Sequence, residues 1–295
     1  MAAGIQLSAP IPMTTAQNIL ETLRDQARKT ATPCGTGELT WRAWGDAAAP
    51  PLVLLHGGFG AWNHWVRNIS LLAETHHVIA PDLPGCGDSA DPPGRPDAES
   101  LAAILSAGLD IVIPDDASFD LVGFSFGGLL GGPIAHLQPH RVRCLTIVGT
   151  PILGLTTTGP ANALVPVPPE LSPEEAAPIY RGNLEKLMVH NPDAVDDLAM
   201  KLHMENMAKN RLRSRGIARR TIAAERLRGL TCRLNFVFGD KDPTLDPDLD
   251  GIRAAAAELQ SDAPFHVFPD TGHWVQYEAA DRFNALLPTL LSTGN

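Results

Sequence analysis

The sequence lacks any long apolar run. No stretch of about 18 or more apolar residues occurs in the 295-residue chain, so no transmembrane helix is expected. The first residues, MAAGIQLSAPIPM, lack a basic start followed by an apolar block, and we expect neither a signal peptide nor a transit peptide. Positive charge is also scarce: the net charge is −10, which argues against nucleic acid or an anionic membrane as a partner.

Cysteines are few, and metal-ligand patterns are missing. The four cysteines (Cys34, Cys86, Cys144 and Cys232) form no Cys-x-x-Cys pair, and no histidine cluster has metal spacing, so we expect no metal and no cofactor. Scattered cysteines are typical of a reducing compartment, which predicts a cytoplasmic location. Most histidines have no partner at motif spacing, and we expect surface or capping roles for His64, His76, His77, His136, His140, His190 and His266.

What the chain does contain is a series of short apolar runs, each ended by Gly, Pro or Asp. They occupy residues 51–58, 76–82, 119–125, 143–150, 233–240 and 264–270, and a run with alternating faces precedes them at 37–45. Helical patterns separate them at 98–112, 127–138, 246–260 and 276–292, and a short amphipathic helix is expected within 14–30. This alternation predicts an α/β fold with a doubly wound, mostly parallel sheet.

The alternation is interrupted once, between residues 152 and 229. A proline-rich segment at 159–178 is followed by helical patterns, with Val195, Leu198, Ala199 and Leu202 on one face. We therefore expect a helical cap at 152–229 over the ligand-binding edge of the sheet, inserted into a core formed by 37–151 and 230–295. Residues 1–36 would form an N-terminal extension.

The strongest motif is Gly-Phe-Ser-Phe-Gly at residues 123–127, between an apolar run and a helical pattern. This context is that of a nucleophile elbow, in which a strained turn lifts the Ser125 hydroxyl above the sheet. Neither the phosphate loop G-x-x-x-x-G-K-[ST] nor the dinucleotide motif G-x-G-x-x-G is present.

A serine nucleophile needs a base and a group that orients the base. The base candidate is His273, at a strand-to-helix turn near the C-terminus. The acid candidate is Asp242 in GDKDP, with the neighbouring Asp240 as the alternative. The order Ser, Asp, His is the one that this arrangement of strands uses.

An oxyanion hole would complete the site. We expect one donor at the backbone N–H of Phe126 and the other in the glycine-rich loop after the first apolar run, at Gly58 or Phe59. His56 opens this loop and is expected to hold loop backbone rather than to take part in the chemistry.

Together the segments HGGFG (56–60), PDLPGCGDS (81–89), GFSFGG (123–128), GDKD (239–242) and GHW (272–274) resemble the α/β-hydrolase superfamily, in its serine-nucleophile branch. The C-terminal segment 272–287 is most similar to the meta-cleavage product hydrolases, which cleave a carbon–carbon bond. That family usually has asparagine where this chain has Phe124. It also uses a cap arginine to hold the substrate carboxylate, and here Arg211 or Arg213 could substitute, with His203 near the expected position.

We expect a small-molecule substrate in an apolar pocket, whose predicted lining is Gly57, Phe124, Trp274, Met200, Met204 and His203. Phe124 favours a carboxylesterase acting on small apolar or aromatic esters through an acyl-enzyme. Two alternatives stay open: a carbon–carbon bond hydrolase and a non-catalytic ligand-binding protein on a hydrolase scaffold. The sequence also leaves a homodimer open.

Overall fold

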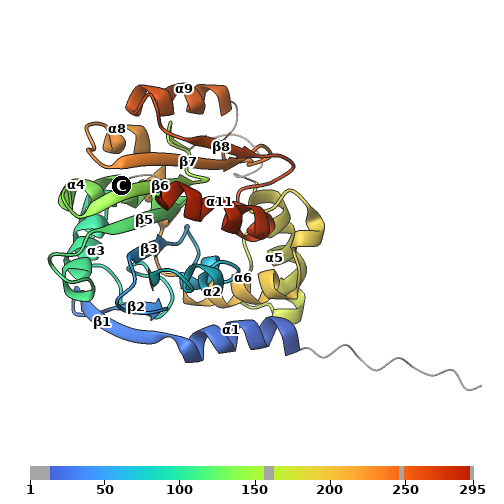
Figure 1. Ribbon diagram of the computed structural model, residues 1–295. Helices are drawn as coiled ribbons and strands as arrows, with labels where there is room; N and C mark the ends of the chain where they lie inside the picture. The colour runs from blue at the N-terminus through green and yellow to red at the C-terminus, as the bar shows by residue number, and fades with distance from the viewer. Residues whose placement is uncertain (1–13, 156–162, 246–248, 293–295) are drawn as a thin grey trace, which may run out of the picture.

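A computed structural model describes residues 14–155, 163–245 and 249–292. One eight-stranded sheet has the order β1-β2-β4-β3-β5-β6-β7-β8 and forms the centre of the molecule (Figure 1). The strands are β1 (Arg28–Cys34), β2 (Gly37–Trp44), β3 (Pro51–Leu55), β4 (His77–Pro81), β5 (Phe119–Phe124), β6 (Val142–Val148), β7 (Arg233–Gly239) and β8 (Phe265–Phe268). The strands β4, β3 and β5 to β8 run parallel, so the predicted fold class is confirmed.

Helices precede, follow and separate the strands. They are α1 (Thr14–Gln26), η1 (Trp62–Trp65), α2 (Ile69–Leu72), α3 (Ala98–Val112), α4 (Phe126–Leu137), α5 (Pro173–Leu187), η3 (Pro192–Ala194), α6 (Asp197–Lys209), α7 (Ser214–Ala218), α8 (Ala223–Leu227), α9 (Leu249–Leu259), α10 (Val275–Glu278) and α11 (Ala280–Ser292). Among the described residues, no helix is both long and apolar enough to cross a membrane.

The parallel strands are buried on both faces, as their continuous apolar sequences require. Along β5, Leu121 packs into a core with α3, α4 and α8, and Val122 packs into a second core with α2 and α11. Figure 1 shows these two groups of helices on opposite sides of the sheet.

One strand lies where only an extension was expected. β1 pairs antiparallel with β2 along its whole length, so the sheet begins inside the segment 1–36. Its sequence, RKTATPC, has no apolar run because only Thr32 and Cys34 are buried at this edge of the sheet. The expected features at residues 1–13, and parts of the proline-rich segment and of the helix at 246–260, lie outside the described residues.

Every regular element in the described part of 152–229 is a helix. The predicted face of α6 is buried, with Leu198 and Leu202 each at most 4% exposed. The inserted segment contributes to both cores: α5 and α6 pack on the side of α1 and α2, whereas Leu212 and Ile217 pack on the side of α3 and α4.

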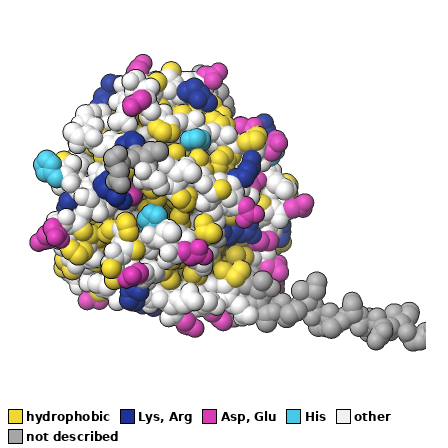
Figure 2. Space-filling view, in the orientation of Figure 1, with side chains coloured by type: hydrophobic (Ala, Val, Ile, Leu, Met, Phe, Trp, Pro, Cys, Tyr) yellow, Lys and Arg dark blue, Asp and Glu magenta, His cyan; other side chains and the backbone are white. Residues whose placement is uncertain are grey.

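Acidic and basic side chains are mixed over the face of the molecule in Figure 2.

Two helical glycines give a matched test of how closely the helices pack. A β-carbon at Gly108 in α3 would lie 2.5 Å from the Trp41 ring, whereas nothing lies within 4 Å of a β-carbon at Gly182 in α5. We expect Gly108→Ala to lower the free energy of unfolding by about 1–3 kcal/mol, because the added methyl group would overpack the core against Trp41. Gly182→Ala should raise it by about 0.5–1 kcal/mol through helix propensity. Urea unfolding measures both, and equal effects of the two substitutions would contradict this packing.

Candidate active site

Ser125 occupies the turn between β5 and α4 in a left-handed conformation, with φ of 52°. Backbone bonds hold it there: its N–H donates to the Val148 carbonyl at 2.8 Å, and its carbonyl accepts from the Thr150 hydroxyl at 2.9 Å. A positive φ at a non-glycine residue costs about 1–3 kcal/mol and persists only when the surroundings impose it. The turn is therefore a strained conformation that the neighbouring strand β6 maintains.

The glycines around Ser125 are required by close approach. A β-carbon at Gly127 would lie 2.5 Å from the Leu55 carbonyl oxygen, and one at Gly128 would lie 2.1 Å from the Thr150 hydroxyl. At Gly123 it would lie 2.5 Å from the Gly128 Cα. Any side chain at these positions would push α4 away from β3 and β5 and displace the serine.

The structure brings Ser125, His273 and Asp242 together from three separate loops. The Ser125 Oγ lies 2.9 Å from His273 Nε2, and His273 Nδ1 lies 2.7 Å from Asp242 Oδ2. His273 and Asp242 are buried, at 3% and 7% exposure. This is the geometry in which an imidazole accepts the serine proton while a carboxylate orients the ring.

Asp242 has a second partner that sequence reasoning missed. The Thr244 hydroxyl and backbone N–H donate to Asp242 Oδ1 at 2.7 and 2.8 Å, which leaves Oδ2 for His273. The alternative acid, Asp240, bonds to Lys241 at 3.0 Å and to the Thr271 N–H instead. The sequence signal for this contact was the threonine two residues after the aspartate in DPT, because Asp and Thr side chains often bond to nearby groups in turns.

The loop 56–60 lies beside Ser125, as the second half of an oxyanion hole requires. His56 Nδ1 bonds to the Gly57 carbonyl at 2.7 Å, and its Nε2 accepts from the Leu83 N–H at 2.9 Å. Burial lowers the pKa of His56, so the ring stays neutral and can accept that bond. His56 therefore links two loops, as the sequence predicted.

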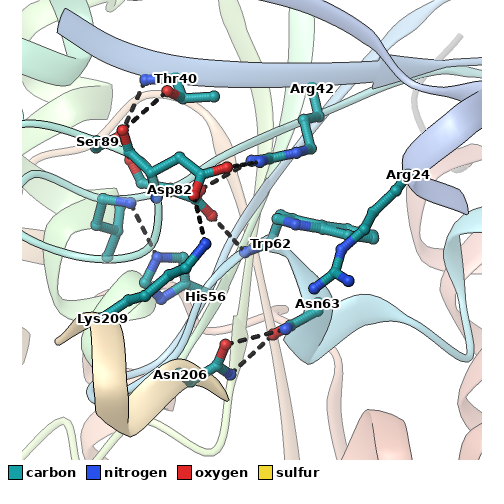
Figure 3. A network of polar contacts seen from close by, with 12 residues as sticks. Arg24, Thr40, Arg42, His56, Trp62, Asn63, Asp82, Ser89, Asn206 and Lys209 are labelled. Carbon is teal, nitrogen blue, oxygen red and sulfur yellow. Dashed lines mark hydrogen bonds and ion pairs between the residues drawn. The ribbon is translucent and has the colours of Figure 1, made fainter. Parts of the chain in front are cut away.

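A buried carboxylate, Asp82, supports the same region (Figure 3). Its oxygens accept from Arg42 Nη1 at 2.8 Å and from the Trp62 N–H at 3.0 Å. Beside it, the Asn63 and Asn206 amides form a reciprocal pair at 2.9 and 2.8 Å, which joins η1 to the cap helix α6. The end of the loop 56–60 is thereby held by both the sheet and the cap.

A cavity of about 60 Å³ opens above Ser125 and His273, and Thr244 also lines it. Besides Ser125 and His273, four of the predicted residues lie on its wall, namely Gly58, Phe59, Phe124 and Phe126. Aliphatic side chains, among them Leu129, Leu155, Leu187 and Met188, form much of the remaining lining. An adjoining cavity of about 280 Å³ shares Gly58, Phe59, Leu187, Met188 and Arg215 with it.

Several predicted pocket residues lie elsewhere. Trp274 stacks on Tyr277 with ring centroids 4.1 Å apart and donates to the His64 carbonyl, so it packs beneath the cap instead of lining either cavity. Gly57 faces the Phe124 ring. Met200 packs against the core, and neither Met200 nor Met204 lines the two cavities, whereas His203 and Met207 line the larger one. On α6, the prediction for His203 therefore agrees with the larger cavity, whereas the positions expected for Met200 and Met204 were wrong.

The surface role expected for His64 is also wrong. All four residues of η1 are buried, and the His64 ring lies between Phe124 and Trp274, with centroids 5.6 and 5.0 Å away. Burial, together with neighbouring histidines, holds its pKa well below the usual value. The two tryptophans that flank it in WNHW were the available sign of burial.

The helix α7 places two further polar residues, Ser214 and Arg215, on the wall of the smaller cavity, and sequence reasoning named neither. The arginine expected there was Arg211 or Arg213. Arg211 instead bonds to Asp91 on the core at 2.6 Å, and Arg213 lines a different groove. Among the described residues, no group of three or more His, Cys, Asp or Glu side chains could hold a metal ion.

Known proteins resemble this chain over most of its length. The chain is 30% identical to the dihydrolipoyllysine-residue acetyltransferase component of an acetoin cleaving system from Pseudomonas putida, over 95% of this chain and 74% of that protein. It is 29% identical to a 2-hydroxy-6-oxononadienedioate/2-hydroxy-6-oxononatrienedioate hydrolase from Paraburkholderia phymatum, over 82% of this chain and 86% of that protein. The esterase RhEst1 from Rhodococcus sp. ECU1013 superposes with a TM-score of 0.74 at 23% identity, over 91% of this chain and all of that one.

The resemblance inferred from the motifs is confirmed, including the similarity to meta-cleavage product hydrolases. The model of the alpha/beta hydrolase family matches residues 52–286, which include the elbow, the loop 56–60 and the loops that carry Asp242 and His273. The chain belongs to the alpha/beta hydrolase family.

Proposed function

We propose that this chain is a serine hydrolase that cleaves carboxylic esters of small apolar or aromatic compounds through an acyl-enzyme. The observation that carries the proposal is the hydrogen-bonded series Ser125, His273 and Asp242 at the floor of a mostly apolar cavity. The buried, mostly apolar surroundings strengthen each of these polar interactions relative to water.

In the first half of the reaction, Ser125 Oγ attacks the ester carbonyl carbon and gives its proton to His273 Nε2. The Asp242 carboxylate stabilises the imidazolium that forms. The carbonyl oxygen becomes negative and accepts from the N–H groups of Phe126 and of Gly58 or Phe59. The tetrahedral intermediate then collapses, and the alcohol leaves with the proton from His273.

In the second half, water attacks the acyl-serine. His273 takes a proton from the water and returns one to Ser125, which releases the carboxylic acid. The N-terminus of α4 begins directly after Ser125, and its dipole favours the negative charge of both tetrahedral intermediates.

The cavities support a small substrate with an apolar part and a polar end. The space above Ser125 is lined by Phe124, Phe126 and aliphatic side chains, and it suits a short acyl group. The adjoining cavity is lined by His64, His203 and Arg215, among others, and its volume of about 280 Å³ suits a larger group. Burial lowers the pKa of His203 to about 4, so at neutral pH this imidazole binds as an uncharged group.

The second candidate is hydrolysis of a carbon–carbon bond in a meta-cleavage product. Arg215 on the cavity wall favours it, because a guanidinium suits a substrate carboxylate, and so does the name of the Paraburkholderia relative. Phe124 argues against it, because an apolar ring stands beside Ser125 where that family usually has a polar side chain.

A ligand-binding protein on the same scaffold is the remaining alternative. It would have no need of an aligned serine and histidine, so labelling of Ser125 by a fluorophosphonate would argue against it.

The four cysteines are free and buried, which supports the predicted cytoplasmic location.

Ser125→Ala tests the nucleophile directly. On a panel of short p-nitrophenyl esters, we expect kcat/KM to fall by at least about 1,000-fold, because the acyl-enzyme can no longer form. A dienol meta-cleavage substrate, followed by loss of its absorbance, is run beside the esters. Faster turnover of the dienol than of every ester would favour the second candidate. Equal slow hydrolysis by wild type and variant would eliminate the proposal.

The two neighbouring aspartates give a matched pair. Asp242→Asn should lower kcat by about 1,000- to 10,000-fold, because the amide cannot hold His273 in the required tautomer. Asp240→Asn should leave kcat within about twofold, because its carboxylate bonds to Lys241 and the Thr271 N–H. Steady-state kinetics with the best ester measures both, and the reverse order of effects would identify Asp240 as the acid.

His203 should make stability sensitive to mild acid. Its folded-state pKa of about 4 lies below the usual 6.5, so the unfolded chain binds the proton more tightly, and stability is lost as pH falls from about 6.5 towards 4. Between pH 7.5 and pH 5, His203→Gln should lose about 2 kcal/mol less unfolding free energy than wild type. The exposed His136 provides the control, and His136→Gln should follow the wild type. Urea unfolding at each pH measures the unfolding free energy. The same pH dependence in wild type and both variants would refute the role of His203.

A further inference from the structure

Ser214, the first residue of the cap helix α7, carries a buried hydroxyl without a hydrogen-bond partner among the described residues. The residue is 2% exposed. A buried hydroxyl that stays unsatisfied costs about 1–3 kcal/mol, and alanine would avoid that cost. Such a group in a native protein calls for an explanation, and its position in the fold provides one.

The hydroxyl lies beside Gly58, one of the residues whose backbone N–H we propose as an oxyanion donor, and Gly58 in turn lies close to Phe126. A β-carbon added at Gly58 would lie 2.6 Å from Ser214 Oγ and 3.9 Å from Phe126 Cβ. Ser214, Gly58, Phe126 and Ser125 all line the same cavity. The cap hydroxyl therefore lies at the end of the cavity where negative charge would develop on the substrate.

The backbone just before α7 is held firmly against the core. The N–H groups of Arg211 and Leu212 both donate to the Gly85 carbonyl, at 2.8 and 3.1 Å. The Arg211 side chain bonds to Asp91 at 2.6 Å, and Leu212 is buried. A donor has to be preorganised to assist catalysis, and this attachment keeps Ser214 in place before the substrate arrives.

We propose that the Ser214 hydroxyl donates a hydrogen bond to the carbonyl oxygen of the bound ester as that oxygen becomes negative. The cap thus supplies a third oxyanion donor beside the two backbone N–H groups. When the bond from Ser125 Oγ to the carbonyl carbon forms, the carbonyl π electrons move to oxygen and the Ser125 proton moves to His273. Ser214 keeps its own proton throughout. The inference rests on the proposed ester hydrolysis.

The close contact also explains the glycine at position 58. Any side chain there would occupy the space of the Ser214 hydroxyl, since its β-carbon would approach to 2.6 Å. Real β-carbons essentially never lie that close to a neighbour. Gly58 is therefore needed for the cap donor as well as for its own N–H.

The test compares Ser214→Ala with Ser106→Ala. Ser106 is also buried, but its hydroxyl accepts from Gln138 at 2.9 Å, on α3 and away from the cavity. Ser214→Ala should lower kcat on the best ester about 10- to 100-fold, with KM changed less than about threefold, because the donor acts mainly in the transition state. Its melting temperature should stay unchanged or rise. Ser106→Ala should show the opposite: lower stability and unchanged kcat.

Binding of phenylboronic acid provides an independent measurement. The tetrahedral boronate that it forms on Ser125 carries an oxygen where the oxyanion would lie. Its affinity should fall in Ser214→Ala by about the same factor as kcat/KM. A kcat and a boronate affinity within threefold of wild type, in an enzyme that Ser125→Ala inactivates, would overturn the inference and leave the proposed function standing. A wild type inactive on every ester would overturn both.

Discussion

The strained turn at Ser125 is the constraint on which the rest of the site depends. The turn exists because α4 begins directly after β5 and passes close to β3 at Gly127 and close to Thr150 and Gly123 at Gly128, which only glycines at these positions permit. On the other side, the Val148 carbonyl at the end of β6 and the Thr150 hydroxyl two residues later hold Ser125 in place. The strained residue follows β5, in which every residue is buried, so the surrounding structure can oppose the strain.

The turn positions Ser125, and two further loops must be held in register with it. Thr244 occupies one carboxylate oxygen of Asp242, so the other is directed at His273. On the opposite side, Asp82 secures the start of η1 and His56 secures the Leu83 backbone. Each of these supports is a buried polar group with its bonds satisfied, which favours a single arrangement over several.

The sequence alone predicted the parallel strands, their helices and the residues that meet at the elbow, because each follows from a local pattern. β1 escaped prediction because an edge strand with one buried face needs no apolar run. The cap was the weaker part. Whether Met200 or Met207 faces the cavity depends on how α6 docks, and that docking relies on distant partners such as Asn63 and Asn206. Ser214 lies in a helix too short to show a period, and its significance appears only beside Gly58.

The attachment of the cap at the Gly85 carbonyl has a consequence for how such a site can change. Residues 211 and 212 fasten the chain to the core, whereas residues 214 and 215 line the cavity above Ser125. Holding and recognition are thus assigned to adjacent but separate positions. Exchanging Arg215 would change the charge of the cavity wall, and exchanging Ser214 would change the hydroxyl beside Gly58, without loosening the insertion from its base. The same scaffold can in this way give rise to hydrolases of different selectivity through very few substitutions.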